Sequence, residues 1–404
     1  MMMITFIHCA DLHLDSPFKG LKGLPKSIFD RLQESTFASF SRLTDAAIEE
    51  KVDFMLIVGD VFDGDMRSLK AQFRFNKEME KLNKYGITVF VSHGNHDHLG
   101  GQWTDLDWPE NVIFFAGNNV QQVPFIKNGV TAALIHGFSY ETKAVEENRT
   151  SQYPVKAGDV HHIGMLHGQA AGYTGHDPYA PFLLQELISK NYDYWALGHI
   201  HKRSELSLQP PVCYSGNIQG RHKNETGEKG AYVVTLNENG AESRFIPTCD
   251  IIWKEIILDM STVDRESDLL NKCLIFKEEM REESRGVLLR VILTGKSSIF
   301  LSLSAFLLEL HDVLNEEENG EDFVYVHEII NDCFPADADG NQSNTGFWSD
   351  VQQTLEDSSW IEETLGDLYH HRQAAKYLDR LPEEEMKELI KQAENELLQE
   401  RFKS

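Results

Sequence analysis

Length, composition and charge set the first limits on this chain. Its 404 residues are enough to bury a substantial core and to form more than one domain. The composition, 41% hydrophobic and 25% charged, is ordinary for a globular protein. The longest apolar stretch, Ile299–Leu314, is interrupted by serines, Glu309 and His311. It is too short and too polar to span a bilayer, so we expect no membrane association.

The net charge of −26 argues at first sight against a nucleic-acid partner. The acidic excess is uneven, however: residues 1–250 carry a net charge of −7, and residues 251–404 carry −19. The rear part is therefore not expected to bind phosphate groups.

The cysteine pattern predicts a reducing compartment. Five cysteines are scattered along the chain, and none forms a C-x-x-C pair. This argues against a disulfide framework and a zinc ribbon, and it favours the cytoplasm. The first eight residues also lack the basic flank and apolar core of a signal peptide.

The first hundred residues predict alternating strands and helices. Apolar runs rich in branched and aromatic residues predict buried strands at Ile4–Ile7, Val52–Val58 and Ile87–Val91. Apolar residues at helical spacing predict helices at Ile28–Lys51 and Ser68–Tyr85. This is a β-α-β-α-β pattern, in which ligands bind at the carboxyl ends of the strands.

From about residue 110 the pattern changes to short strands in quick succession, with a helix expected near Pro181–Lys190. This mixture predicts an α/β fold with two packed sheets and helices outside. A second β-α-β-α-β pattern follows in the rear part. We expect a main domain at 1–248, a small α/β domain at 249–332, a linker at 333–346 and an acidic helical tail at 347–404, which we interpret as a partner-binding segment.

Short polar clusters follow five of the predicted strands, at the point where each apolar run ends. They read Asp11-Leu-His13, Gly59-Asp60-Val-Phe-Asp63, Gly94-Asn95-His96-Asp97, His167-Gly168 and Gly198-His199-Ile-His201. Strand ends of this kind converge on one edge of a sheet. Aspartate, asparagine and histidine gathered there offer the oxygen and imidazole ligands of a divalent metal site.

Taken singly, each cluster is weak. Strand-end Gly-Asp is common turn chemistry, and His167 alone is more often a buried core histidine. Two imidazoles two residues apart, as in His199 and His201, share one side of an extended segment. All five clusters in order point instead to a pair of metal ions that cleaves phosphate esters, a site that needs a bridging carboxylate and a proton donor.

The clusters resemble those of the calcineurin-like metallophosphoesterases, whose pattern is D-x-H, G-D-x-x-D, G-N-H-D/E, a lone histidine and G-H-x-H. The resemblance covers about residues 3–235. The opening FIHCADLHLDSPFKGL and the stretch SHGNHDHLG are more similar still to the SbcD-like DNA exonuclease subunits, and within them to bacterial YhaO-type proteins. The resemblance implies a four-layer αββα sandwich, followed by a small capping domain and C-terminal helices.

The resemblance also implies roles for individual residues. One metal would be held by Asp11, His13, Asp60 and His201, and the other by Asp60, Asn95, His167 and His199, with Asp60 as the bridge. His96 would be the general acid, oriented by Asp63. Some nuclease relatives carry a histidine in place of Asp63. At this position the sequence therefore departs from the pattern of those relatives. The mixed oxygen and imidazole ligands suit Mn²⁺, with Fe²⁺ and Zn²⁺ as alternatives.

Three functions fit these ligands. The resemblance implies a DNA exonuclease subunit in DNA repair, a homodimer with a coiled-coil ATPase partner, that uses a metal-bridged hydroxide as nucleophile. A small-molecule phosphodiesterase or phosphatase, for example on cyclic nucleotides, and a scaffolding subunit are the alternatives. Arg203, Arg221 and His222 are candidates for contacting substrate phosphate, although a solvated loop cation is an equal interpretation of each. The lack of a stronger basic cluster argues against DNA.

Overall fold

The structure, a computed structural model, describes residues 1–336 apart from 19–20, 22, 65–66, 105, 118 and 172–178, together with Met386 and Ile390. The expected helical tail at 347–404 lies outside the described residues apart from these two. No helix in the described part of the chain is long and apolar enough to cross a membrane. The chain divides into two compact units, the first made of residues 1–254, 281–288 and 319–323, and the second of residues 255–280, 289–318 and the last described strand.

The first unit contains two mixed six-stranded sheets. One sheet has the order β12-β11-β1-β2-β3-β4, and the other has the order β5-β6-β7-β8-β10-β9. The elements of the first sheet and its helices are β1 (Ile4–Ala10), α1 (Lys26–Glu49), β2 (Phe54–Val58), α2 (Leu69–Lys84), β3 (Thr88–Ser92), β4 (Val112–Phe114), β11 (Gly230–Asn237) and β12 (Gly240–Pro247). Those of the second sheet are β5 (Gln121–Lys127), β6 (Val130–Gly137), β7 (His161–His167), α3 (Leu184–Ile188), β8 (Tyr194–Gly198), β9 (Ser204–Leu208) and β10 (Pro211–Tyr214), with a 3-10 turn η1 (Thr150–Gln152).

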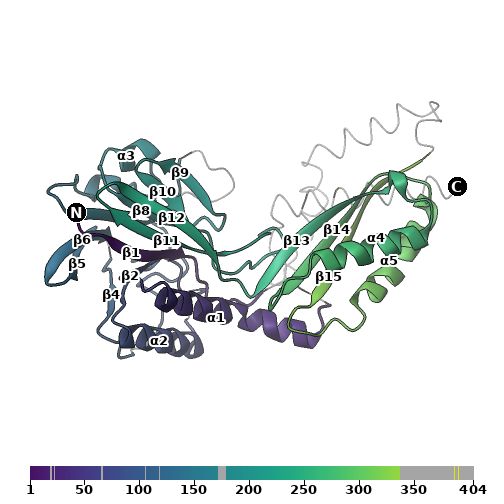
Figure 1. Ribbon diagram of the computed structural model, residues 1–404, viewed down its shortest axis with the longest axis horizontal. Helices are drawn as coiled ribbons and strands as arrows, with labels where there is room; N and C mark the ends of the chain where they lie inside the picture. The colour runs from purple at the N-terminus through teal and green to yellow at the C-terminus, as the bar shows by residue number, and fades with distance from the viewer. Residues whose placement is uncertain are drawn as a thin grey trace, which may run out of the picture. The chain divides into compact units, whose positions relative to one another are not determined.

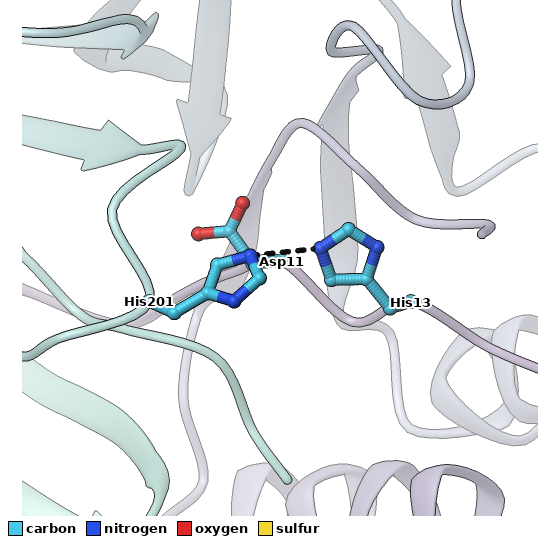
Figure 2. A group of neighbouring side chains, drawn as sticks. All are labelled: Asp11, His13 and His201. Atoms are coloured by element: carbon cyan, nitrogen blue, oxygen red, sulfur yellow. Dashed lines mark hydrogen bonds between the residues drawn. The ribbon is translucent and has the colours of Figure 1, made fainter. Parts of the chain in front are cut away.

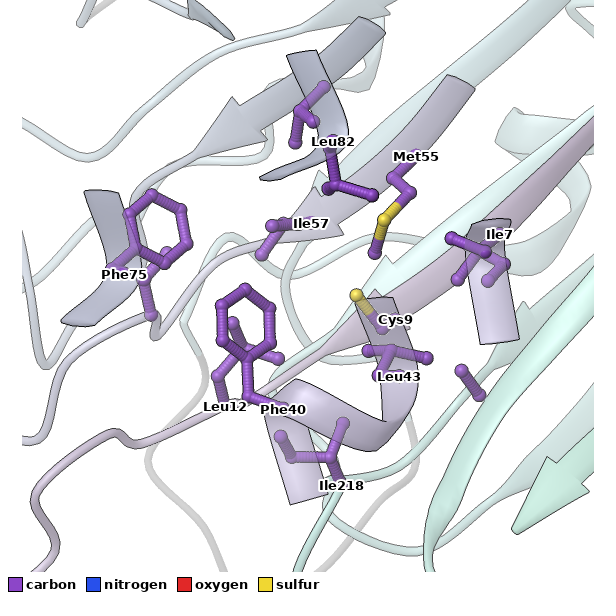
Figure 3. Packing of buried hydrophobic residues seen from close by; sticks show 14 of the residues in the cluster. Ile7, Cys9, Leu12, Phe40, Leu43, Met55, Ile57, Phe75, Leu82 and Ile218 are labelled. Atoms are coloured by element: carbon purple, nitrogen blue, oxygen red, sulfur yellow. The ribbon is translucent and has the colours of Figure 1, made fainter. Parts of the chain in front are cut away.

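The central strands are buried on both faces, and alternate side chains enter different cores. In β1, Ile7 and Cys9 pack with α1 and α2, whereas Phe6 faces the second sheet. Figure 3 shows the first of these cores, where Phe40 of α1 and Phe75 of α2 lie over the strands. A third core covers the outer face of the second sheet under α3. The layers are therefore helix, sheet, sheet and helix, which confirms the expected fold class (Figure 1).

Two strands were absent from the sequence-based prediction. β9 and β12 lie at the edges of their sheets and pair antiparallel with β10 and β11. Both are polar and half exposed, with patterns such as Ser-Glu-Leu-Ser-Leu, because an edge strand has little apolar surface to bury. The helix expected at Pro181–Lys190 is limited to Leu184–Ile188, after a loop in which the Leu183 N–H donates to Glu186 Oε2 at 2.9 Å.

The second unit is built on a three-stranded sheet of order β13-β14-β15. Its elements are β13 (Ile251–Asp259), which begins in the first unit, η2 (Met260–Thr262), α4 (Glu266–Glu279), β14 (Gly286–Ser297), α5 (Phe300–Asn315) and β15 (Val324–Pro335). The two helices bury their apolar faces, including Leu269 and Leu303. β15 continues to Pro335, past the point where a linker was expected to begin, because Cys333 is still a buried strand residue.

Gly164 is required by the packing of β7 against β8. It lies directly opposite Trp195 in the parallel register. A Cβ atom at Gly164 would lie 2.2 Å from Trp195 Cε3, and the indole is fully buried. We predict that Gly164→Ala lowers the free energy of unfolding by about 1–3 kcal/mol through overpacking. Thermal or urea unfolding would measure this loss.

Trp195→Leu provides the control for this prediction, because leucine lacks the contacted ring atoms. The cost of Gly164→Ala should be smaller in the Trp195→Leu background than in the wild-type chain. An equal cost in both backgrounds would show that the clash with the indole is not the cause.

Candidate metal centre

The five polar clusters lie at the carboxyl ends of parallel strands. β1, β2 and β3 run parallel in the first sheet, and β7 and β8 run parallel in the second. The loop after β1 carries Asp11 and His13, and the loop after β2 carries Asp60. His167 is the last residue of β7, and His199 directly follows β8. The packing of the two sheets therefore brings side chains from five strands to one edge.

The backbone around these side chains adopts conformations that L residues rarely use. The φ angles are positive at Asp11 (52°), His13 (42°), Asp60 (48°) and His199 (94°). Such residues cost of order 1–3 kcal/mol each and cluster at functional sites. The first two loops hold each other in place, because Asp11 N–H donates to Gly59 O at 3.2 Å and His13 N–H donates to Asp60 O at 3.0 Å.

Two motif glycines allow the close approach of the clusters. Gly59 has a φ of +76°, and a Cβ atom there would lie 2.1 Å from His167 Nδ1. A Cβ atom at Gly94 would lie 2.3 Å from Asp60 Oδ1. Any larger residue at either position would push apart the side chains that the strands bring together.

The first group of donor atoms belongs to Asp11, His13 and His201, whose potential ligand atoms lie within 4.8 Å of one another (Figure 2). His13 Nε2 and His201 Nε2 are 3.0 Å apart. Asp60 Oδ2 is 3.8 Å from the same His13 nitrogen. These are the four residues that the resemblance assigns to one metal.

The second group lies around Asp60 and His167. His167 Nε2 is 3.0 Å from Asn95 Oδ1 and 3.5 Å from Asp60 Oδ2. The ring of His199 lies 5.3 Å from the ring of His167. Asp11 also belongs to a group with Asp60 and His167 whose ligand atoms are within 4.8 Å of one another, so it lies between the two groups. The backbone N–H of His199 holds it there by donating to both carboxylate oxygens, at 3.1 Å each.

Two imidazoles direct the same nitrogen towards the centre. His201 Nδ1 lies 2.6 Å from Glu225 Oε1, and His167 Nδ1 lies 3.1 Å from Val58 O. A carboxylate or carbonyl oxygen only accepts hydrogen bonds, so each Nδ1 carries the proton. Each Nε2 then presents a lone pair to the cluster, which is the tautomer of a metal-ligating histidine. The donor groups therefore fit divalent metal ions.

The electrostatics of the centre favour a bound cation as well. Burial raises the pKa of Asp11 to about 6, and the neighbouring Asp60 carboxylate adds to this rise. Burial also lowers the pKa of His13 to about 3, so this imidazole is neutral at pH 7. Two buried carboxylates beside the neutral His13 imidazole favour a bound cation, and a divalent ion would compensate their negative charge.

Asp63 is the meeting point of three cationic or imidazole groups beside the donor atoms. Its Oδ1 lies 3.3 Å from His13 Nδ1, 3.3 Å from His96 Nδ1 and 2.8 Å from Arg221 Nη2. Contact with Asp63 raises the pKa of His96, which favours its protonated form. The His96 side chain is 42% exposed, so a substrate can reach it.

The three predicted phosphate-binding residues have different surroundings. Arg221 contacts Asp63, and its Nε donates to Ser16 Oγ at 2.9 Å. The Arg203 guanidinium lies instead over the Phe245 ring, 3.7 Å from its centroid. His222 is exposed, and its Nδ1 accepts a hydrogen bond from the Asn224 N–H at 3.3 Å. Of the three, the structure brings Arg221 next to the cluster.

Sequence reasoning missed residues that support the cluster from behind. Asp97 is fully buried and accepts hydrogen bonds from Val61 N–H at 2.9 Å and Gly94 N–H at 2.7 Å. Tyr140 donates to His167 O at 2.8 Å. Asp97 ends the predicted Gly94–Asp97 cluster and was detectable on that ground. Tyr140 and Glu225 lie far from the motifs in sequence, and no local pattern marks them.

Comparison with known proteins identifies the family. Residues 4–203 match the model of the calcineurin-like phosphoesterases. Over 403 residues, covering 97% of this chain and 96% of its relative, the chain is 40% identical to the uncharacterized metallophosphoesterase YhaO of Bacillus subtilis. The chain belongs to the calcineurin-like metallophosphoesterases. The family resemblance of the five clusters is thereby confirmed, and the chain is a phosphoesterase by family.

More distant relatives carry the name DNA double-strand break repair protein Mre11. The protein of Methanocaldococcus jannaschii is 28% identical over 280 residues, which cover 65% of this chain and 71% of the relative. That of Saccharolobus solfataricus is 25% identical over 328 residues, which cover 77% and 80%. Both alignments are longer than the 200 or so residues of the family match.

Asp11 gives a test of the charge excess in the metal-free protein. Its raised pKa means that the folded state binds this proton more tightly than the unfolded state, so stability is lost as the pH rises through about 6. With a metal chelator present, we predict that Asp11→Asn stabilises the fold more at pH 7.5 than at pH 5, by on the order of 1–3 kcal/mol. Urea unfolding at both pH values measures the difference.

Asp97→Asn is the matched control, because hydrogen bonds and the nearby His93, acting against burial, lower the pKa of Asp97. Removing the negative charge of Asp97 by this substitution should destabilise the fold at pH 7.5. The charge argument would be contradicted if both substitutions changed stability with the same sign at that pH.

Proposed function

We propose that this protein is a dimetal-dependent phosphodiesterase, and that its substrate is DNA, which it degrades from the ends as the nuclease subunit of a repair complex. One observation carries the proposal: the accessible His96, held by Asp63, lies beside two adjoining groups of metal-ligand atoms. A proton donor next to a metal pair is what hydrolysis of a phosphodiester with a poor leaving group requires.

Asp11, His13, Asp60 and His201 would hold one ion, and Asp60, Asn95, His167 and His199 the other. Two divalent ions bound there would polarise the phosphoryl group and activate water for attack. Imidazole, amide and carboxylate donors together suit Mn²⁺ or Fe²⁺. The absence of thiolates from this set makes Mn²⁺ our choice for assays.

His96 would protonate the departing sugar oxygen. Its Nδ1 faces Asp63, so its Nε2 is the atom left to donate a proton to substrate. Asp63 raises the pKa of His96 and so keeps this proton in place at neutral pH. Arg221 is the cation placed to bind a non-bridging phosphate oxygen, because Asp63 and Ser16 hold its guanidinium beside His96.

The choice of DNA rests on the Mre11 relatives, which are named as DNA double-strand break repair proteins and whose alignments cover about two thirds or more of this chain. A small-molecule enzyme needs little beyond the first unit. We propose that the α/β unit after residue 254 caps the site, and that the acidic tail binds a coiled-coil ATPase. A cytoplasmic location is part of the same proposal.

His96→Ala separates the role of general acid from that of a structural residue. On end-labelled duplex DNA with Mn²⁺ we expect a loss of about 10²–10⁴-fold, because the sugar oxygen leaves slowly without a proton. On bis(p-nitrophenyl) phosphate we expect a loss of less than about tenfold, because nitrophenolate leaves unprotonated. Steady-state rates on both substrates measure the ratio.

Asp60→Asn serves as the control, because Asp60 belongs to both donor groups and both activities should disappear. Equal losses on the two substrates for His96→Ala would contradict its role as general acid. Hydrolysis of the small diester or of a cyclic nucleotide without DNA cleavage would assign the protein to the small-molecule class. No metal-dependent hydrolysis of any of the three would overturn the proposed activity of the isolated chain.

We further propose that the protein is a homodimer that associates through α1 and α2. A groove of about 450 Å³ lies between these helices and is lined by Phe37 and Phe73 together with Lys70 and Arg74. Phe73 is 53% exposed, so its ring offers apolar surface beside the groove for contact with a second copy of the chain.

Phe73→Asp should convert the dimer to a monomer of 46.1 kDa in size-exclusion chromatography with light scattering. An aspartate in an apolar contact cannot be desolvated without a partner. Ile126 lies on the edge strand β5, and its side chain is as exposed as that of Phe73. Ile126→Asp should therefore leave the dimer intact. A wild-type protein that is monomeric at all concentrations, or a dimer that persists in Phe73→Asp, would show that this face is not the interface.

A further inference from the structure

Glu225 makes more contacts with the metal centre than its position in the sequence suggests. It lies in the loop between β10 and β11, outside every motif discussed above. Its Oε1 accepts a hydrogen bond from His201 Nδ1 at 2.6 Å. Its Oε2 accepts from Asn217 Nδ2 and from Arg221 N–H, both at 2.7 Å. One carboxylate thus joins a candidate ligand to the loop that carries Arg221.

The carboxylate itself is held firmly. Asn217 is fully buried, and Glu225 N–H donates to His222 O at 2.9 Å. On the other side, Lys229 Nζ donates to His201 O at 3.2 Å, so the backbone of the histidine is fixed as well. Glu225 and His201 therefore meet in a defined geometry and not as two mobile surface groups.

The hydrogen bond to Glu225 determines what His201 offers to the centre. With the proton on Nδ1, Nε2 is a lone-pair donor, and this atom lies 3.0 Å from His13 Nε2. A histidine that carried its proton on Nε2 instead would present N–H to the cluster and could not bind a cation there. In His167 a backbone carbonyl has the same task, whereas His201 depends on a side chain that a single substitution can change.

We propose that Glu225 is a positioning residue of the metal centre: it fixes the tautomer and the ring orientation of His201 and thereby sets the affinity for one of the two ions. The proposal rests on the proposed function, because it takes His201 as a ligand. Partners of this kind typically contribute 10–100-fold to metal affinity. The effect should be confined to the ion that His201 binds, since His167 Nδ1 is held by Val58 O and not by Glu225.

Glu225→Gln distinguishes this role from that of a residue that only stabilises the loop. A glutamine has one carbonyl oxygen, which can still accept from Asn217 and Arg221 N–H. Its NH₂ group then faces His201 Nδ1 and forces the proton of the imidazole onto Nε2. Glu225→Gln should therefore preserve the loop and disturb the ligand.

The experiment titrates Mn²⁺ into the chelator-stripped full chain and follows binding by calorimetry. We expect two ions in the wild type, and in Glu225→Gln a 10–100-fold weaker affinity for one of them with the other unchanged. The midpoint of thermal unfolding without metal should stay within a few degrees of the wild type. Glu228→Gln is the control, because Glu228 lies in the same loop but faces Arg285, and its metal affinity should match the wild type.

A double-mutant cycle with His201→Ala decides whether Glu225 acts through the histidine. Glu225→Gln should weaken binding no further once His201 is absent. Wild-type affinity in Glu225→Gln, or an equal additional loss in the His201→Ala background, would overturn the inference while leaving the metal centre standing. A wild-type chain that binds no divalent ion would overturn the metal centre itself.

Glu225→Asp is the second variant if Glu225→Gln fails to fold. It keeps the negative charge but withdraws it by one methylene, so it should show a smaller loss of affinity for the same ion. No loss of affinity in Glu225→Asp would count against the inference.

Discussion

The structure depends on one electrostatic constraint, the burial of Asp11 and Asp60 against imidazoles that point their lone pairs inward. Two carboxylates without hydrogen-bonding water or a counter-charge are costly in a protein interior. The burial that raises the pKa of Asp11 to about 6 is a direct expression of that cost. A divalent cation reverses it, because the same crowded oxygens and nitrogens become ligands. The residues at the edge where five strands end therefore favour the binding of an ion, at a cost to the stability of the metal-free protein.

The backbone bears part of the same cost. Asp11, His13 and Asp60 hold positive φ angles, and each is kept there by hydrogen bonds from the neighbouring loop. Gly59 and Gly94 leave the space into which His167 and Asp60 reach. The strands beneath are buried and carry apolar side chains on both faces. Their packing holds the loops in these strained conformations.

The sequence predicted the layered fold and the gathering of the clusters because both follow from short-range patterns. An apolar run that ends in Gly-Asp or Gly-Asn-His marks a buried strand and its ligand-bearing end within a few residues. The edge strands β9 and β12 escaped prediction because their largely polar sequences contain no apolar run of this kind. Glu225 escaped for a different reason: its partner His201 lies 24 residues away, and only the folded loop reveals the hydrogen bond.

The charges around Asp63 bear on how an acidic chain can act on a phosphate ester. Asp63 adds a negative charge next to His13 and His96, and Arg221 neutralises it at 2.8 Å. A neutral residue at position 63 would need no such cation, so Asp63 and Arg221 form one unit. Arg221 is consequently not a free positive charge that attracts substrate from a distance; it contributes at contact range only. If DNA is the substrate, long-range attraction must come from the bound ions or from a partner subunit, because the chain itself carries a net charge of −26.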